Sequence, residues 1–344
     1  MPAGSDPARV TIKDVARVAG VSVATVSRVL NASGPVADDT RDRIHRVAQE
    51  LRFVPNGAAR SLSTRRTGTL GVLLPDLHGE FFSEVIRGLD QAAQARGFHL
   101  LLSSSHNHLD DIEAALRAMR GRVDGLVVMS PHIDAAVLSA NLHGSVPAVL
   151  LNSPDPAGEF DTLRVDNFGG AREMVRHLLA HGHRRVAMVC GPARNHDADE
   201  RLRGYRAALA EAGVDGSAAL EIEGDFTDEG GFRAARAVLG APQRPTAVFA
   251  ANDATAIGLI GALREAGLAV PADVAVGGFD DIPISRYLTP PLTSVRVSIN
   301  ELGARAMEQL VRAVEGENRH ARVDETLPTT LVVRESCGCG AAKR

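Results

Sequence analysis

The chain has 344 residues, 44% of them hydrophobic, so it exceeds one small domain and can bury one or two substantial cores. Its three cysteines are too few for a disulfide framework, and Cys190 lies in an apolar run that indicates a buried free thiol. The sequence begins with no secretory leader and contains no apolar run of membrane-spanning length, so we expect a cytoplasmic protein without a membrane partner.

The formal net charge of −4 is distributed unevenly along the chain. Residues 1–66 hold 11 Lys and Arg against 6 Asp and Glu, whereas the remainder holds 27 against 36. A basic segment of this kind displaces counterions from a phosphate backbone, and an acidic remainder is repelled by it. The charge pattern predicts that the N-terminal part binds nucleic acid and that the rest has another function.

Two short helices joined by a turn at Gly20 are predicted near the N-terminus, which is the arrangement of a helix-turn-helix. Thr11 and Asp14 have the spacing of a capping box, and Ala16 is small enough to admit the second helix. Ser22 can cap the second helix by accepting a backbone hydrogen bond. The expected buried stripes are Val15, Ala16 and either Val18 or Ala19, followed by Val26, Val29 and Leu30.

The outer face of the second helix carries small, weakly charged side chains where a surface helix usually carries Lys and Glu. Such a face can approach another surface closely, and Arg28 can make bidentate hydrogen bonds to guanine O6 and N7. This pattern favours a helix that lies in a DNA groove over a generic three-helix bundle. The side chains left on this face are Val23, Ala24, Thr25, Ser27, Arg28 and Asn31.

A third helix is expected within residues 38–53, where apolar residues recur at helical spacing from Ile44 onward. Asp38 or Asp39 is expected to cap this helix, and Pro55 to stop it.

Residues 55–71 are interpreted either as a disordered linker or as a short helix that wedges into DNA. Asn56 can cap such a helix, with Ala59 and Leu62 on its faces. Leu62 suits an apolar wedge that partly unstacks a base step in the minor groove while arginines hold phosphates. The arginines near it are Arg60, Arg65 and Arg66.

From residue 69 onward, short apolar runs alternate with amphipathic helical patterns, which predicts βα winding with parallel sheets. The length suits two such sheets, with an expected break near residues 163–170. Expected strands lie within residues 69–77, 99–105, 124–130, 147–152, 184–191, 246–253 and 273–281, and expected helices include 81–96, 168–182 and 254–267.

Polar residues gather at the carboxyl ends of the expected strands, where open α/β sheets bind ligands. Carboxylates and amides there can exchange hydrogen bonds with several hydroxyls, as can Arg201, and Phe82 or Phe226 can cover an apolar ring face. We expect a cleft between two lobes that binds a polyhydroxylated ligand, the alternative for any single Asp being helix capping. The strand-end set is Asp76, Ser103 to Ser105, Ser130, Asn152, Asp166, Asn252, Asp253, Asp280 and Asp281.

Several long motifs follow one another along the chain, namely TIKDVARVAGVSVATVSRVLN, LRFVPNGAARSL, RLRGY, TAVFAANDATAIG, VGGFDD, PPLTSVR and LVVRES. In this order they resemble the LacI/GalR family of bacterial transcription repressors over essentially the whole chain. The resemblance implies an all-α helix-turn-helix head, a hinge helix and a two-lobed α/β body similar to periplasmic sugar-binding proteins. It also implies a homodimer on near-palindromic double-stranded operator DNA, control by a small effector that is most often a sugar, and no cofactor.

The resemblance sets the expected domain boundaries. The helix-turn-helix head covers residues 1–54, the hinge and linker 55–68, and the effector-binding and dimerisation domain 69–340. Within that domain the N-lobe takes in about 69–164 and 295–326, and the C-lobe about 165–294 and 327–340.

The resemblance also carries roles to individual residues. The implied DNA-binding residues are Thr11, Ser22, Val23, Ala24, Thr25, Ser27, Arg28 and Asn31 in the head, with Asn56, Ala59 and Leu62 in the hinge. Of these, the implied base readers are Val23, Ala24 and Arg28. The implied effector-binding residues are Asp76, Phe82, Arg201, Phe226, Asn252 and Asp280.

Two departures from the family pattern bear on the effector. The loop after Asp76 reads HGEFF, so His78 or Glu80 is available to the cleft and can alter ligand choice. Where purine-responsive members carry an arginine and a threonine, this chain has Asn195 and Asp197, which favours a neutral polyol. A regulator that responds to a nucleobase or another non-sugar ligand is the alternative.

Other functional classes fit the sequence less well. It has no GxSxG elbow, Walker A loop or HExxH motif, so no enzyme activity is expected. A solute-binding protein, the nearest rival, would need a leader and no basic head. His181 and His183 flank a helix-ending Gly182, and two thiolates, Cys337 and Cys339, fall short of a closed zinc site, so no metal site is expected.

Overall fold

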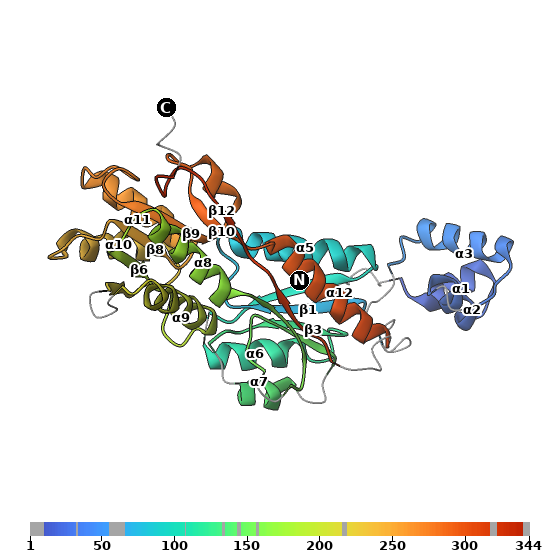
Figure 1. The fold of residues 1–344 in the computed structure, drawn as a ribbon. Helices are drawn as coiled ribbons and strands as arrows, with labels where there is room; N and C mark the ends of the chain where they lie inside the picture. The colour runs from blue at the N-terminus through green and yellow to red at the C-terminus, as the bar shows by residue number, and fades with distance from the viewer. Residues whose placement is uncertain are drawn as a thin grey trace, which may run out of the picture. The chain divides into compact units, whose positions relative to one another are not determined.

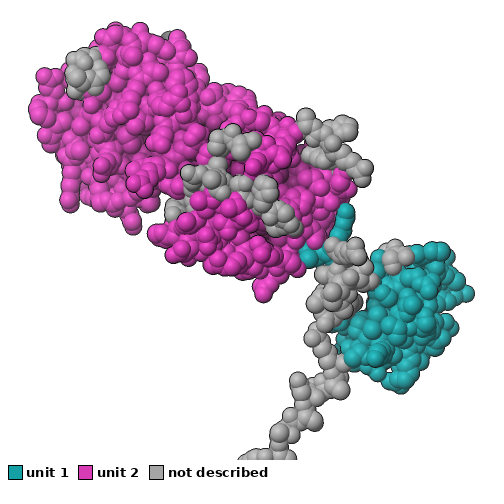
Figure 2. Space-filling view, turned by 90° about the horizontal axis from the view of Figure 1, so that it is seen from below, with its two compact units in different colours: residues 1–67 teal, residues 68–344 magenta. Residues whose placement is uncertain are grey.

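The computed structural model describes residues 10–31, 34–54, 66–106, 108–132, 135–142, 146–155, 158–214, 219–316 and 322–339. The chain divides into two compact units, residues 1–67 and residues 68–344 (Figure 2). None of the described helices is long and apolar enough to cross a bilayer.

The first unit contains the three helices that the sequence predicts. Thr11 and Asp14 form the expected capping box, with the Thr11 backbone NH donating to Asp14 Oδ2 at 3.0 Å. The first helix ends at Gly20, whose φ of +66° lies in the left-handed region that glycine adopts without steric cost. The helices are α1 (Ile12–Ala19), α2 (Val23–Leu30) and α3 (Asp38–Glu50).

The core of this head draws apolar residues from all three helices. Ala19 completes the stripe of α1, because Val18 is 49% exposed. The prediction that Asp38 or Asp39 caps α3 is wrong, since the N-cap is Ala37. Both carboxylates lie instead in the first turn, where the positive end of the helix dipole favours them. The buried residues are Val15, Ala16, Ala19, Val26, Val29, Ile44, Val47 and Ala48.

Within its described residues, the second unit holds two six-stranded sheets with helices on both faces of each (Figure 1). The first sheet has the order β11-β5-β4-β3-β1-β2, and all its neighbouring strands are parallel. Its strands are β1 (Thr69–Leu74), β2 (His99–Ser104), β3 (Leu126–Met129), β4 (Ala148–Leu151), β5 (Asp161–Val165) and β11 (Asp324–Leu327).

The faces of the first sheet are covered by two pairs of helices. Alternate residues of β1 face opposite sides: Leu70 and Val72 pack with α5 and α12, whereas Leu73 packs with α6. Helices α5 and α12 approach closely because a glycine lies on each; a Cβ on Gly88 would lie 2.0 Å from the Asn300 carbonyl oxygen. These helices are α5 (Glu80–Ala95), α6 (Leu109–Met119), α7 (Ala135–Leu142) and α12 (Ile299–Glu315).

The second sheet has the order β12-β10-β9-β8-β6-β7 and is parallel except for its antiparallel edge strand β12. Helices α8 and α9 cover one face, and α10 and α11 the other. The strands are β6 (Val186–Val189), β7 (Glu221–Ile222), β8 (Ala247–Ala250), β9 (Ala275–Asp280), β10 (Thr293–Arg296) and β12 (Thr330–Val332). The helices are α8 (Asn167–Ala180), α9 (His196–Glu211), α10 (Asp228–Gly240) and α11 (Asp253–Glu265), with a short 3-10 helix at Pro283–Tyr287.

The chain passes between the two sheets three times, after β5, after β10 and after β11. Each sheet with its helices forms one lobe, so neither lobe is made of one continuous segment. Parallel sheets of this kind bind ligands beyond the carboxyl ends of their strands, which are the places to search for a site.

Candidate functional site

The face of α2 that points away from the head core is the candidate DNA-contacting surface. Ser22 caps α2 as predicted, with its Oγ accepting from the Thr25 backbone NH at 3.1 Å. At the other end, Asn31 Nδ2 donates to Ser27 Oγ at 3.2 Å. The exposed side chains on this face are Val23, Ala24 and Arg28, and the half-buried ones are Thr25, Ser27 and Asn31.

Arg28 is exposed on this face and differs in its surroundings from Arg17 and Arg41. Arg17 forms an ion pair with Asp14, and Arg41 forms one with Asp38. Arg28 makes no hydrogen bond or ion pair with any described residue of the head. Its guanidinium therefore keeps its donors for an external acceptor, as base readout requires.

Three of the predicted DNA-binding residues, Asn56, Ala59 and Leu62, fall outside the described residues. The hinge helix and its leucine wedge therefore stay predictions from the sequence.

In the second unit, the candidate ligand site is a buried polar cluster around Arg201. The Arg201 Nε donates to Asn167 Oδ1 at 2.8 Å, and Nη1 donates to the Ala251 carbonyl at 2.6 Å. Nη2 donates to Asp280 Oδ1 at 3.2 Å, which makes an ion pair between two side chains that are each 5% exposed. A fixed cation thus lies where α9 and the ends of β8 and β9 meet.

Two aromatic rings border this guanidinium. Its central carbon lies 3.8 Å from the ring centroid of Phe279, which is fully buried, and 5.4 Å from that of Phe226. A Cβ on Gly191 would lie 2.4 Å from the Phe226 ring, so the glycine makes room for that ring. The cation–π contacts hold the guanidinium in place.

Two buried carboxylates flank Arg201. Burial raises the pKa of Asp280 and that of Asp197 to about 6, although the Arg201 charge acts to lower both. Asn167 Nδ2 donates to Asp197 Oδ1 at 2.9 Å, so Asn167 connects Asp197 to the arginine. The described residues give Asp280 Oδ2 no donor, which leaves this oxygen as an acceptor for a ligand.

The backbone at the cluster is strained at several non-glycine residues. The φ angle is +104° at Asp280, +66° at Phe226 and +45° at Asn152, all in the region that L residues rarely adopt. Such conformations persist where surrounding structure enforces them, and they concentrate at ligand sites.

Of the six predicted effector residues, the structure brings four together, namely Arg201, Phe226, Asn252 and Asp280. Asn252 Nδ2 donates to the Phe226 carbonyl at 3.0 Å, while its Oδ1 accepts from the Thr255 NH at 3.0 Å. Asn252 thus caps α11 and holds Phe226 in this structure.

The other two predicted effector residues, Asp76 and Phe82, lie beyond β1 and have local contacts. Asp76 Oδ1 accepts from the backbone NH groups of Leu77 and His78 at 2.6 and 3.0 Å. Phe82 packs edge-to-face with Phe81 at a centroid distance of 5.4 Å. Their roles toward a ligand stay predictions.

Two aspartates of the strand-end set hold the fold together instead of facing a ligand. Asp253 is fully buried and accepts from Ser285 Oγ, Ser294 Oγ and the Ile282 NH at 2.5, 2.5 and 2.9 Å. Burial and the neighbouring Asp280 raise the pKa of Asp253 to about 8, against these hydrogen bonds. The other, Asp281, forms ion pairs with Arg296 and Arg334.

Several contacts join the two lobes. Glu80, which the sequence offered to the cleft, accepts from the Ile284 NH at 2.9 Å. Asn195, the N-cap of α9, has its Nδ2 3.1 Å from the Nε2 of His132, which follows β3. Burial lowers the pKa of His132, so its imidazole is favoured in the neutral form.

The sequence interpretation missed Asn167, Phe279 and His132. Each lies within two residues of a residue in the predicted strand-end set, so its position in the sequence already indicated that it could lie near the site. Their side-chain types alone gave no reason to select them, because an isolated Asn, Phe or His is ordinary at such a place.

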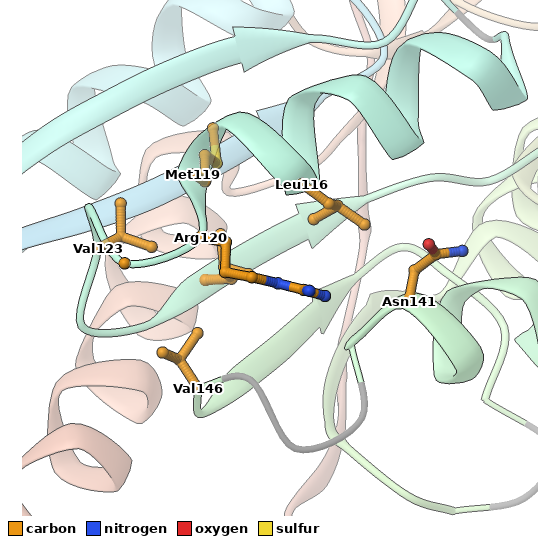
Figure 3. A pocket seen from close by; sticks show the side chains of 8 residues that line it. Leu116, Met119, Arg120, Val123, Asn141 and Val146 are labelled. Carbon is orange, nitrogen blue, oxygen red and sulfur yellow. The ribbon is translucent and has the colours of Figure 1, made fainter.

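A small hollow in the first lobe lies between α6 and α7 (Figure 3). It lies toward the start of β3, the edge opposite the carboxyl ends of the strands, and carries no carboxylate. The Arg201 cluster, and not this hollow, is therefore the candidate ligand site. The lining residues are Leu116, Met119, Arg120, Gly121, Val123, Leu126, Asn141 and Val146.

Comparison with known proteins now identifies the family. Residues 11–56 match the bacterial regulatory proteins of the lacI family, and residues 175–337 match the periplasmic binding protein-like domain. The HTH-type transcriptional repressor PurR of Erwinia tasmaniensis is 37% identical over 333 residues, which cover 96% of this chain and 97% of the relative. The chain belongs to the LacI family. It is a DNA-binding transcriptional repressor and not an enzyme.

Another relative and two solved structures are similar to this chain along nearly their whole length. The ribose operon repressor of Escherichia coli K12 is 36% identical over 307 residues, covering 88% of this chain and 93% of the relative. The lac repressor dimer bound to operator and the anti-inducer ONPF has a TM-score of 0.86 at 31% identity, covering 95% and 99% of the two chains. The CelR–cellobiose complex has a TM-score of 0.72 at 34% identity, covering 95% and 100%. The predicted family and fold class are thereby confirmed.

Proposed function

We propose that this LacI-family repressor binds a near-palindromic operator as a homodimer, and that a small neutral effector of the sugar class controls its operator affinity. The observation that carries the effector class is the buried set of Arg201, Asp280 and Asp197, in which a fixed donor lies between two carboxylate acceptors.

The hydrogen-bonding capacity of this set matches adjacent hydroxyl groups. A guanidinium has about five N–H donors, and Arg201 gives donors to Asn167, Ala251 and Asp280. The remaining donors and the second oxygen of Asp280 can serve neighbouring hydroxyls, each of which both donates and accepts. An enclosed polar site rejects ligands that leave its groups unpaired, which gives such a set its selectivity.

Of the two rings that border Arg201, Phe279 cannot stack on a ligand, which leaves the half-buried Phe226 as the ring that a ligand can cover. Stacking a base needs an open ring face, but Phe279 is fully buried and its ring borders the Arg201 guanidinium at 3.8 Å. Two of the similar proteins carry sugar names, the ribose operon repressor and the CelR–cellobiose complex. These names favour the sugar class.

The DNA half of the proposal depends on α2. One recognition helix covers only a few base pairs, so a useful operator needs two heads and hence two chains. The exposed small side chains and the unpartnered Arg28 of α2 support base contact, with Leu62 proposed as a minor-groove wedge. A similar protein, the lac repressor, is a dimer bound to operator in its solved structure.

Coupling between the two halves requires that the effector prefer one arrangement of the lobes. The lobes already touch through Glu80 with Ile284 and through His132 with Asn195. An effector held by Asp280 and Arg201 would add to or compete with these contacts. Loss of the Asp280 contact should therefore remove control as well as affinity.

The test combines a ligand screen with operator titration. Thermal shift of the full chain against monosaccharides, disaccharides, sugar acids and nucleobases identifies the effector, and fluorescence anisotropy then follows its action on operator-bound protein. Asp280→Asn should keep near-native operator affinity and lose the effector response. Asp273→Asn is the control, because Asp273 is an exposed carboxylate that precedes the start of β9, whereas Asp280 lies at its end.

A normal effector response in Asp280→Asn would remove Asp280 from the site. A nucleobase that stabilises the chain and shifts operator binding, with no sugar doing so, would overturn the sugar class. A monomer on operator DNA in light scattering would overturn the dimer.

A further inference from the structure

Three side chains of the kinds that bind metals lie together where the last turn of α8 meets the C-terminal segment after β12. Cys339 Sγ lies 3.1 Å from His177 Nε2, and Cys337 Sγ lies 3.4 Å from the same nitrogen. The two sulfur atoms are 2.9 Å apart, and all three donor atoms lie within 4.8 Å of one another. Only the two thiols are neighbours in the sequence, and the histidine, 160 residues before Cys337, completes the group.

The local backbone brings these side chains to one point. Gly338, between the two cysteines, has φ +80°, a left-handed conformation that a side chain would disfavour, and it turns both thiols to the same side. His177 lies in the last turn of α8 and faces them. Thr293 Oγ1 on β10 donates to Cys337 Sγ at 3.1 Å, which orients that sulfur from the far side.

The group of His177, Cys337 and Cys339 is largely buried but is open to solvent on one side. Cys337 is 1% exposed, whereas His177 and Cys339 are half-buried. Its donor atoms are two sulfurs and one imidazole nitrogen, with no carboxylate among them. Soft sulfur and imidazole donors select Zn²⁺ or Cu⁺ over Mg²⁺, Ca²⁺ and Mn²⁺, which prefer oxygen.

We propose that His177, Cys337 and Cys339 bind one thiophilic metal ion, for which Zn²⁺ is the first probe and Cu⁺ the second. Two sulfurs on one tetrahedral Zn²⁺ lie about 3.8 Å apart, so the Cys339 side chain has to move outward by about 1 Å. On binding, both S–H bonds break, two metal–sulfur bonds form and the two protons pass to the buffer. Water reaches the fourth position on the exposed side of the group.

Metal binding at this place would fasten the C-terminal segment to α8. That segment is already held by Arg334, which donates to the Leu292 carbonyl and pairs with Asp281. An ion that binds only the folded chain stabilises it in proportion to its concentration above the dissociation constant. The melting temperature of the full chain should therefore rise with added Zn²⁺.

The test uses the full chain, reduced with a phosphine and stripped of metal with a chelator. Co²⁺ as a spectroscopic stand-in should produce a thiolate-to-cobalt charge-transfer band, which Zn²⁺ displaces at one equivalent per chain. Cys339→Ser and His177→Gln should each lower the Zn²⁺ affinity by about 100-fold or more. Cys190→Ser should bind as the parent does, because Cys190 lies at the end of β6, outside the group.

A measurement on the unmodified chain does not depend on any variant folding. Bound Zn²⁺ or Cu⁺ should protect Cys337 and Cys339, identified by peptide mass, from alkylation. Tight Cu⁺ binding without Zn²⁺ binding would assign the ion as Cu⁺ at the same site. The proposal is overturned by the absence of a thiolate band and of protection, by unchanged affinity in Cys339→Ser or His177→Gln, or by a Cys337–Cys339 disulfide in protein kept under reductant.

Discussion

The recognition face of α2 and the cluster around Arg201 prepare hydrogen-bonding groups for a ligand in opposite ways. On α2 the side chains of Val23, Ala24 and Arg28 are exposed, and Arg28 has no partner among the described residues. Around Arg201 the side chains are buried and bonded to one another. The contrast follows from ligand size, because DNA brings a large surface to an exposed helix, whereas a small molecule has to be enclosed.

This contrast has a consequence for mutation. A side chain exposed on α2 can be removed without leaving a buried group unpaired, so the cost falls on binding. A side chain in the Arg201 cluster holds other buried groups, so its removal costs stability as well. Substitutions in the two regions should therefore separate losses of binding from losses of stability.

Removing Arg201 should have the largest effect. Arg201→Ala leaves Asp280 and Asp197 buried without their cation, and should lower the free energy of unfolding by about 3–5 kcal/mol. Urea unfolding measures the loss. Arg203→Ala is the control, because Arg203 lies on the same helix but is exposed. Equal losses in the two variants would break the division between buried and exposed polar groups.

The pH dependence of stability should show the same buried carboxylates. Burial raises the pKa of Asp280 to about 6, above its ordinary value of 3.8, so the folded chain holds more protons than the unfolded chain between these values. The stability that this group contributes is present below about pH 4 and is lost as the pH rises through 6, by up to about 1.4 kcal/mol per pH unit.

The measurement compares the parent with Asp280→Asn, which cannot titrate there. Urea unfolding between pH 4 and pH 7 should show the parent losing stability relative to the variant as the pH rises. Parallel curves for the two proteins would mean that the Asp280 pKa is not raised.

Arg28→Ala should cost about 1–3 kcal/mol in binding to specific operator, with a smaller loss on random DNA and no loss of thermal stability. Fluorescence anisotropy with the two DNA duplexes measures the difference. Arg17→Ala on α1 is the control, because Arg17 is exposed but already paired with Asp14. A similar loss on operator and random DNA would remove Arg28 from base readout.

Ser22→Ala should have the smallest effect, and it is an exception because this exposed residue contributes to stability. Ser22 is exposed, yet its hydroxyl caps α2 by accepting from Thr25, so its loss should cost the head about 1 kcal/mol of stability. Amide hydrogen exchange of α2 in the full chain detects this. Ser27→Ala should change exchange less, because the Ser27 hydroxyl accepts a hydrogen bond from the Asn31 side chain and caps no backbone NH among the described residues. Identical exchange in both variants would mean that the Ser22 cap does not stabilise α2.

Local sequence determined the parts of this protein that depend on short-range contacts. The capping box of Thr11 and Asp14, the Ser22 cap and the turn at Gly20 each join residues within a few positions, so spacing and residue type were sufficient. Alternating apolar runs likewise predicted the parallel strands. Where two neighbouring residues were equivalent locally, as with Val18 and Ala19, the pattern could not choose between them. At the start of α3 the residue types favoured Asp38 or Asp39 as the cap, but the helix begins directly after Ala37.

Tertiary structure alone decided how the polar strand-end residues divide between a ligand site and the frame of the fold. Arg201 meets Asn167 and Asp280 across 34 and 79 residues of sequence, and His177 meets Cys337 across 160. Asp253 and Asp280 look alike in the sequence, yet Asp253 receives two donors from the loop after β9 and one from β10, whereas Asp280 keeps one oxygen open. The reason is that the partners of a buried polar group decide its role, and here those partners come from helices, strands and loops of the second lobe that are far apart in the sequence.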